Sequence, residues 1–100
     1  MTINLQSLHF DADKKLISFA EEKVNKLKLF HEGIVNAEVI LRLEKSSNKE
    51  NKISEIKIKV SGDELFAKKQ CSTFEESIDD CVAALKTQVL KYKEKQGSNL

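Results

Sequence analysis

The chain is organised around residues 72–95, whose sequence is STFEESIDDCVAALKTQVLKYKEK. Apolar residues recur there at steps of three and four, the spacing of one helical face: Phe74, Ile78, Cys81, Val82, Leu85, Val89 and Tyr92. Thr73 with Glu76 has the spacing of a capping box, and Ser72 with Glu75 repeats it one residue earlier. Gly97 follows the last periodic residue, as is typical near a helix end. We therefore expect one long helix with a buried face.

Charge is sorted along this predicted helix. The acidic residues come first (Glu75, Glu76, Asp79 and Asp80) and the lysines follow (Lys86, Lys91, Lys93 and Lys95). This order complements the helix dipole, which favours anions at the start and cations at the end. It also concentrates positive charge on the C-terminal half, whose outer side is free for a partner.

The preceding residues predict one further helix and four strands. Alternation around Ile3 and Leu5 indicates a strand over residues 2–8, and Asp13 is placed as the N-cap of a helix that ends at Gly33. The apolar side of that helix carries Leu16, Phe19, Ala20, Val24, Leu27 and Phe30. Alternating segments at 37–44 and 55–60, and Leu65 with Ala67, predict three more strands. A polar loop at 45–52 and a tight turn at 61–63 separate them.

The order is therefore strand, helix, three strands, helix. Strands joined by short connections pair antiparallel, so the last three should form a meander. One apolar sheet face, covered by both helices, gives an α+β fold: a two-layer β-α-β-β-β-α domain with a four-stranded sheet. We expect a single domain over residues 1–96 and a frayed tail at 97–100.

Composition narrows the class of protein. The formal net charge is +1 although 33% of the residues are charged, so nucleic-acid binding would have to rest on local patches. No apolar run reaches the ~20 residues of a membrane span, and no signal peptide is visible, so a cytoplasmic protein without membrane contact is expected. Cys81 falls on the apolar helix face and is expected to pack there. A disulfide with Cys71 remains an alternative.

The sequence holds no catalytic constellation. His9 and His31 lack the spacing of a zinc site, and His31 is interpreted as a structural residue on or beside the apolar face of the first helix. The acidic residues at 75–80 lack the spacing and turn glycine of a calcium loop. Gly62 stands alone, which excludes a phosphate-binding glycine loop. We expect no enzyme activity, no cofactor, no metal and no small-molecule substrate.

Lysines follow the flanks of both predicted helices. Lys15, Lys23 and Lys26 lie along one flank of the first, with Glu22 interrupting them. On the second helix, Lys91 and Lys95 share one flank, whereas Lys86 and Lys93 share the other. Packed side by side, the helices could merge these flanks into one cationic surface for phosphates. The alternative is an ordinary solvated surface.

Several segments, taken in order, resemble a known family. They are Phe19 with 23–27 (KVNKL), then 37–45 (AEVILRLEK), 60–67 (VSGDELFA), 78–79 (ID), 85–89 (LKTQV) and 91–93 (KYK). The chain is similar over nearly its whole length to the short form of the ribosome hibernation-promoting factors, also called the ribosome-associated inhibitor or sigma-54 modulation family.

The resemblance implies the fold predicted above and a ribosomal partner. Members bind the small ribosomal subunit between head and body, on the path of messenger and transfer RNA, and so inhibit translation on idle ribosomes. Lys23, Lys26, Lys91 and Lys93 stand at positions that match the family's basic residues. With Lys86 and Lys95, which the flank pattern adds, they are the expected rRNA-binding residues. Ala84 and Thr87 stand where members often carry basic residues. No dimerising domain follows residue 100, so pairing of ribosomes is expected to need another factor, and the free chain is expected to be monomeric.

Two other functions remain open. The element order partly coincides with a double-stranded-RNA-binding module, but such a module would start its last helix with lysines, where this chain has Glu75 and Glu76. A protein–protein adaptor or small homo-oligomer could instead use a sheet edge or the outward Ile40 and Phe66.

Overall fold

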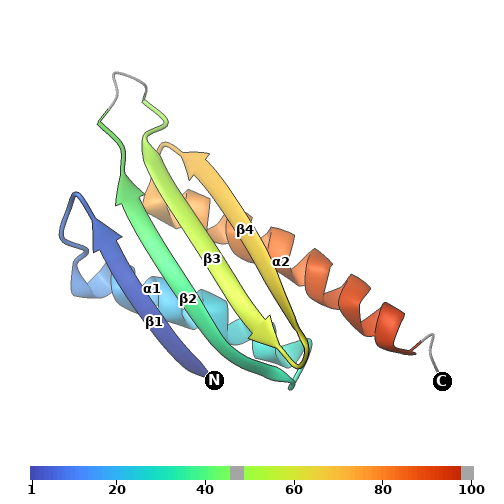
Figure 1. The fold of residues 1–100 in the computed structure, drawn as a ribbon. Helices are drawn as coiled ribbons and strands as arrows, with labels where there is room; N and C mark the ends of the chain where they lie inside the picture. Colours follow the sequence, from blue (N-terminus) through green and yellow to red (C-terminus); the bar gives the residue numbers. More distant parts are fainter. Residues whose placement is uncertain (46–48, 98–100) are drawn as a thin grey trace.

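The computed structural model describes the backbone of residues 1–45 and 49–97 and the side chains of residues 1–45 and 49–95. Its elements are β1 (Thr2–Leu8), α1 (Lys14–Asn25), the 3₁₀ turn η1 (Lys26–Leu29), β2 (Ile34–Leu43), β3 (Lys52–Val60), β4 (Asp63–Cys71) and α2 (Phe74–Gly97) (Figure 1). This is the predicted order. Gly97 still belongs to α2, and the rest of the predicted tail, 98–100, lies outside the described residues, as does the middle of the predicted 45–52 loop.

The strands form one sheet in the order β1-β2-β3-β4. Strands β2, β3 and β4 pair antiparallel, which confirms the predicted meander. Strand β1 pairs parallel with β2, with Leu5 opposite Val39. A parallel neighbour requires a crossover, and α1 with η1 supplies it between β1 and β2.

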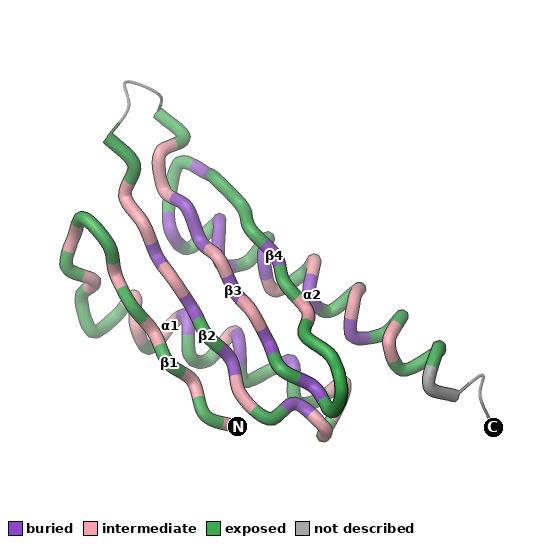
Figure 2. The backbone as a smooth tube through the Cα atoms, viewed as in Figure 1, coloured by how far each residue is buried: buried purple, intermediate pink, exposed green. Residues whose placement is uncertain are grey.

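Both helices lie against the same face of the sheet (Figure 1). Their buried side chains meet the inward residues of β2, β3 and β4 in one core, which appears as alternating purple segments along the strands in Figure 2. The largest fully buried side chains include Leu27, Leu41, Ile56, Ile58, Ile78 and Leu85. The predicted two-layer α+β domain is therefore confirmed. Neither helix, as far as the chain is described, is long and apolar enough to cross a membrane.

Both predicted helix starts are present. The Asp13 carboxylate accepts a hydrogen bond from the backbone N–H of Leu16 at 2.8 Å, and the Thr73 hydroxyl accepts one from the N–H of Glu76 at 3.1 Å. Each bond satisfies a backbone donor that the first helical turn leaves without a partner. Gly62, with φ of 81°, occupies the tight turn between β3 and β4, in a conformation that favours glycine.

The first helix and three strands have boundaries that differ from the predictions. The first helix was expected to continue as α-helix toward Gly33, but α1 ends at Asn25 and the tighter η1 follows. In η1 Leu27 stays buried, whereas Leu29 is 81% exposed, as expected when 3₁₀ geometry replaces the α-helical period. Strands β2, β3 and β4 are longer than predicted because backbone pairing continues beyond the alternating segments, as between Ile34 and Val60 and between Ile53 and Gln70.

Buried polar groups fasten the start of α2 to β3. The Ser77 hydroxyl donates to the carbonyl of Phe74 at 3.0 Å, so the Ser54 hydroxyl is the donor in the 2.5 Å bond between the two serines. The Cys81 thiol donates to the carbonyl of Ser54 at 3.2 Å. Cys81 is thus packed as predicted, and Cys71 and Cys81 are both free thiols, so the disulfide alternative is wrong.

Candidate nucleic-acid interface

Lys23 bridges the two helices. Its ammonium lies 3.1 Å from a carboxylate oxygen of Asp79 on α2 and 5.4 Å from the centre of the Phe19 ring. The side chain of Lys23 is only 31% exposed, so its aliphatic stem packs at the edge of the core while its ammonium reaches solvent. Because the Asp79 carboxylate partly neutralises the Lys23 ammonium, Lys23 attracts a phosphate less strongly than an unpaired lysine would.

Lys86 also has a partner within the chain. Its ammonium lies 4.6 Å from the centre of the Phe30 ring, which follows η1. This is a cation–π contact, and it leaves the charge exposed to solvent on the outer side of α2. The Lys86 side chain therefore points toward η1, with its ammonium over the Phe30 ring.

Lys26, Lys91 and Lys93 are exposed and, within the described part of the chain, form no ion pair. Lys93 lines hollows together with Phe30 and His31, so it lies on the same side of α2 as Lys86. Lys91 lies on the other side, because three residues earlier Gln88 donates to the Phe66 carbonyl of β4 at 2.8 Å. Lys95 is exposed four residues after Lys91, on the same side.

The six predicted lysines are thus divided between two surfaces. Lys23, Lys26, Lys86 and Lys93 lie on the α1 and η1 side of the helix layer, whereas Lys91 and Lys95 lie toward β4. The two flanks predicted on the last helix are present, but α2 separates them, so the lysines do not merge into one patch.

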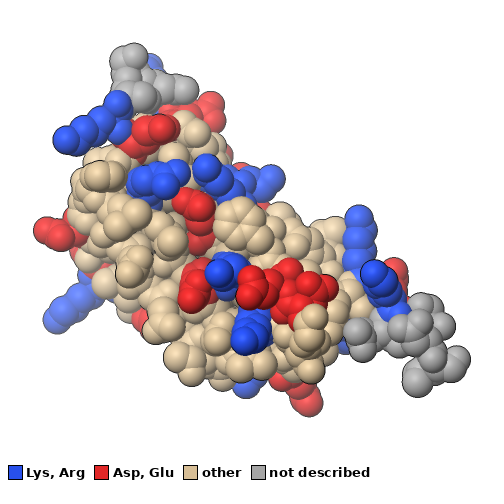
Figure 3. Space-filling view, in the orientation of Figure 1, with Lys and Arg blue, Asp and Glu red and all other residues tan. Residues whose placement is uncertain are grey.

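The C-terminal half of α2 extends beyond the sheet (Figure 1). At about 1.5 Å per residue, its 24 residues span about 36 Å, longer than a strand of nine residues at about 30 Å. Lysine or arginine side chains occur on this projecting part in Figure 3. Those lysines can reach a partner from either side of the helix without interference from the sheet.

The open face of the sheet has a different character. Arg42 pairs with Glu55 at 3.3 Å, and Lys57 lies 3.3 Å from Glu38 and 3.9 Å from Glu64. Figure 3 shows positive and negative side chains interspersed over this face. As predicted, Ile40 and Phe66 point outward, and Phe66 is 50% exposed. Lys59 and Lys68 are also exposed on this face and form no ion pair within the described chain, so the sheet face carries both paired and unpaired basic residues.

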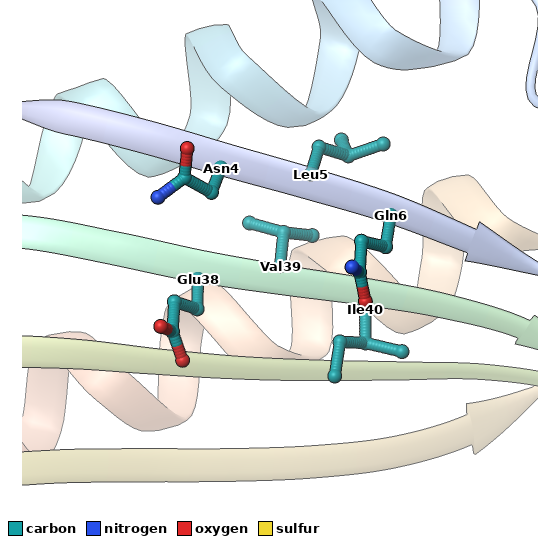
Figure 4. Close-up of a pocket in the computed structure, with 6 residues that line it drawn as sticks. All are labelled: Asn4, Leu5, Gln6, Glu38, Val39 and Ile40. Carbon is teal, nitrogen blue, oxygen red and sulfur yellow. The ribbon is translucent and has the colours of Figure 1, made fainter.

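A shallow hollow lies between β1 and β2 (Figure 4). Its lining is Asn4, Leu5, Gln6, Glu38, Val39 and Ile40. The single carboxylate in that lining, Glu38, pairs with Lys57, and no histidine, cysteine or serine accompanies it. The lining of this hollow therefore lacks the acid, base and nucleophile that a catalytic site combines.

Cys71, Glu76 and Asp80 approach one another at the start of α2, with their donor atoms within 4.8 Å. The Cys71 thiol donates a hydrogen bond to Asp80 at 3.5 Å. Burial, followed by this bond, raises the pKa of the Cys71 thiol to about 11. The thiol is therefore protonated at neutral pH and acts as a hydrogen-bond donor to Asp80.

His31 does not lie where the sequence analysis placed it. It follows η1, outside the first helix, and its ring centre is 5.5 Å from that of Tyr92. The early end of α1 causes this change, because the 3₁₀ turn redirects the chain toward β2. Tyr92 in turn donates to the carbonyl of Ser61 at 2.7 Å, a contact that helical spacing could not indicate.

Residues 3–97 match the sequence model of the family described as Sigma 54 modulation protein / S30EA ribosomal protein. The chain belongs to this family. Members similar to it include a ribosome hibernation promoting factor of Azotobacter vinelandii, 30% identical over 96% of this chain and 86% of the relative. One from Pseudomonas putida is 28% identical over the whole chain and 94% of the relative.

Two solved structures are similar to this chain in fold. A ribosomal subunit interface protein from Coxiella burnetii superposes with a TM-score of 0.83 at 24% identity, covering 94% of this chain and 99% of that one. The N-terminal domain of Thermus thermophilus Protein Y gives 0.79 at 22% identity, covering 92% of this chain and 99% of that domain. These likenesses confirm the fold, and the family match confirms the resemblance.

Proposed function

We propose that this protein is a non-enzymatic ribosome hibernation factor that binds the small ribosomal subunit in the mRNA and tRNA channel and inhibits translation on idle ribosomes. The observation that carries the proposal is the contrast between the two faces. The helix layer presents Lys26, Lys91 and Lys93 without ion pairs in the described chain, whereas on the sheet face Arg42 and Lys57 are paired with carboxylates. Relatives named ribosome hibernation promoting factors support the choice of partner.

The physical basis is neutralisation of rRNA phosphates. Each phosphate that a lysine neutralises releases counterions, so affinity falls as salt rises. A net charge of +1 gives little long-range attraction, so binding must depend on where the lysines lie. Lysines held on α1, η1 and α2 bring their charges to the RNA with little further ordering of the backbone.

Sedimentation with separated ribosomal subunits tests the proposal. The purified chain should migrate with small subunits at low salt and leave them as salt rises, and it should reduce translation in an extract. Sedimentation with large subunits alone, or no sedimentation at low salt, would overturn the proposal.

The double-stranded-RNA alternative meets an obstacle in the structure. Glu75 and Glu76 occupy the exposed first turn of α2, where a duplex groove would bring phosphates. Like charges at that point oppose binding. The adaptor alternative has the exposed Phe66 in its favour, and a change in native mass without ribosomes would support it.

A further inference from the structure

We propose that a hollow at the η1 end of the molecule binds one unpaired nucleotide of RNA, with its base against the rings of His31 and Tyr92 and its phosphate at Lys93. We call this the nucleotide hollow and define it by Phe30, His31, Ser61, Tyr92 and Lys93. This inference rests on the proposed function only in taking the nucleotide to be part of ribosomal RNA, because binding itself can be measured on the free chain.

The hollow has the size and position of a subsite. Two adjacent depressions, of about 300 and 430 Å³, share His31 and Lys93. Small-molecule sites begin at about 300 Å³, so an unstacked nucleotide fits, whereas a folded domain does not. The walls come from three separate segments: the η1–β2 connection, the β3–β4 turn and the C-terminal half of α2.

The aromatic walls are held in place before any ligand arrives. The Tyr92 hydroxyl donates to the Ser61 carbonyl at 2.7 Å, which anchors the ring beside the β3–β4 turn. The His31 ring lies 5.5 Å from the Tyr92 ring, centre to centre, at an interplanar angle of 45°. Rings fixed in this way offer faces to a base at little entropic cost, and stacking on an aromatic side chain stabilises a bound base by about 1–3 kcal/mol.

Gly33 is part of the same arrangement. A Cβ atom at this position would lie 2.9 Å from Cε1 and 3.0 Å from Nε2 of His31. The imidazole therefore occupies the space that any other residue at position 33 would fill. Gly33 beneath the ring and Tyr92 beside it determine where His31 lies.

The charges favour a phosphate with a planar base. Lys93 lines both depressions and forms no ion pair within the described chain, and Lys86 lies over the Phe30 ring at the same end. An acidic peptide could use the lysines but would leave the rings without a planar partner. The opposing charge is Glu32, an exposed residue in the lining of the second depression. Its removal should strengthen binding.

The test is an NMR titration of the isotopically labelled full chain with a single-stranded RNA tetranucleotide. We expect the largest amide shifts at His31, Gly33, Ser61 and Lys93. Substitutions His31→Ala and Lys93→Gln should each weaken binding by roughly 5- to 100-fold, and Glu32→Gln should strengthen it. Lys91→Gln is the matched control, because it removes the same charge two residues away on the β4 side of α2. Unchanged sheet amides establish that each variant is folded.

Parallel titrations with inorganic phosphate and with a tetra-aspartate peptide complete the experiment. Equal shifts from phosphate alone would reduce the hollow to an anion site, and equal shifts from the peptide would make it a cationic patch for proteins. Equal losses in Lys91→Gln and Lys93→Gln would overturn the assignment to this hollow. A chain that sediments with small subunits but shows no RNA-dependent shifts at the hollow would overturn this inference and leave the proposed function intact. A chain that binds the tetranucleotide but not ribosomes would do the reverse.

Discussion

Lys23 illustrates how one contact changes the role of a residue. By sequence it belongs to a basic flank of the first helix, yet its ammonium is paired with Asp79 at 3.1 Å. Both side chains are partly solvated, so the pair adds about 0–1 kcal/mol to stability. Its larger effect is on the charge that the helix layer presents, because Asp79 cancels one of the lysines predicted to contact RNA.

Substituting Asp79→Asn should therefore strengthen ribosome binding. The change frees Lys23 and removes a negative charge from the helix layer, so we expect affinity for small subunits to rise several-fold, with thermal stability changed by less than about 1 kcal/mol. Quantitative co-sedimentation over a salt series provides the measurement. Asp11→Asn, an exposed position before α1, is the control with the same charge change. Weaker binding of Asp79→Asn would mean that the ion pair itself holds the interface in shape.

The buried thiol of Cys81 should make the stability of the protein depend on pH. Burial raises the pKa of its thiol to about 12, from an ordinary value of 9.0. Above pH 9 the unfolded chain loses this proton and the folded chain keeps it, so the free energy of unfolding should fall as pH rises from 9 toward 12. The slope contributed by one such group is at most about 1.4 kcal/mol per pH unit.

Urea unfolding between pH 8 and 11 compares this slope in the unmodified chain and in Cys81→Ala. The variant should be less stable at pH 8 because it leaves a small cavity, so the comparison concerns the slopes and not the absolute stabilities. A shallower decline in Cys81→Ala is expected. Identical slopes would mean that other groups, such as the lysines, account for the alkaline loss.

At the scale of elements, α2 contributes most to the core. It packs against β3, β4, α1 and η1, and its residues Ile78, Cys81, Leu85 and Val89 are fully buried. Its start is fixed by the Thr73 cap and by the serine pair with β3. Its C-terminal half is still held by the buried Val89 and by the bonds of Gln88 and Tyr92, so the same helix is both the main structural element and the carrier of four predicted contact lysines.

Truncation of Leu85 tests the structural role of α2. Leu85→Ala should lower the free energy of unfolding by about 2–5 kcal/mol, because the side chain is fully buried and leaves a cavity. Leu90→Ala removes the same atoms from a side chain that is 41% exposed and should cost markedly less. Chemical denaturation of both variants gives the comparison. Equal losses would show that the two leucines are supported alike and that the core boundary along α2 is wrong.

At the scale of the whole molecule, the fold separates two surfaces of different character. On the sheet face, Arg42 and Lys57 pair with carboxylates of neighbouring strands, whereas the helix layer presents the exposed Lys26, Lys91 and Lys93 without ion pairs in the described chain. A net charge of +1 conceals this asymmetry. The placement of charge, rather than its total, should therefore govern binding to rRNA.

Charge reversal at two sets of lysines tests placement against total charge. Lys26, Lys91 and Lys93 reversed to Glu should lower affinity for small subunits by at least about 100-fold, because three attractions become three repulsions, each on the order of 1 kcal/mol. The control set, Lys45, Lys49 and Lys59, is also exposed and changes net charge equally, but lies outside the helix layer. Equal losses in two folded variants would show that affinity follows total charge, and a loss confined to the control set would place the interface elsewhere.

Local pattern was sufficient to predict the elements and their order. Helical spacing in residues 72–95, alternation in the strands and the caps at Asp13 and Thr73 depend on residues close in sequence, and each is present in the structure. The inward and outward sides of the strands follow from the same alternation, including the outward Phe66. These properties are local, because one or two turns of helix or one strand suffice to specify them.

Contacts between distant segments were decided only by the tertiary structure. The end of α1 at Asn25 and its 3₁₀ continuation place His31 beside Tyr92 and Phe30 under Lys86, and the packing of α1 on α2 joins Lys23 to Asp79. The sequence of one helix does not indicate how the other helix is rotated or shifted along its axis when the two pack together. The sequence alone therefore predicted which lysines occur on helical flanks. The packing of the two helices on one sheet determined which of those lysines remain unpaired, because side-chain partners depend on the angle and distance at which two elements meet.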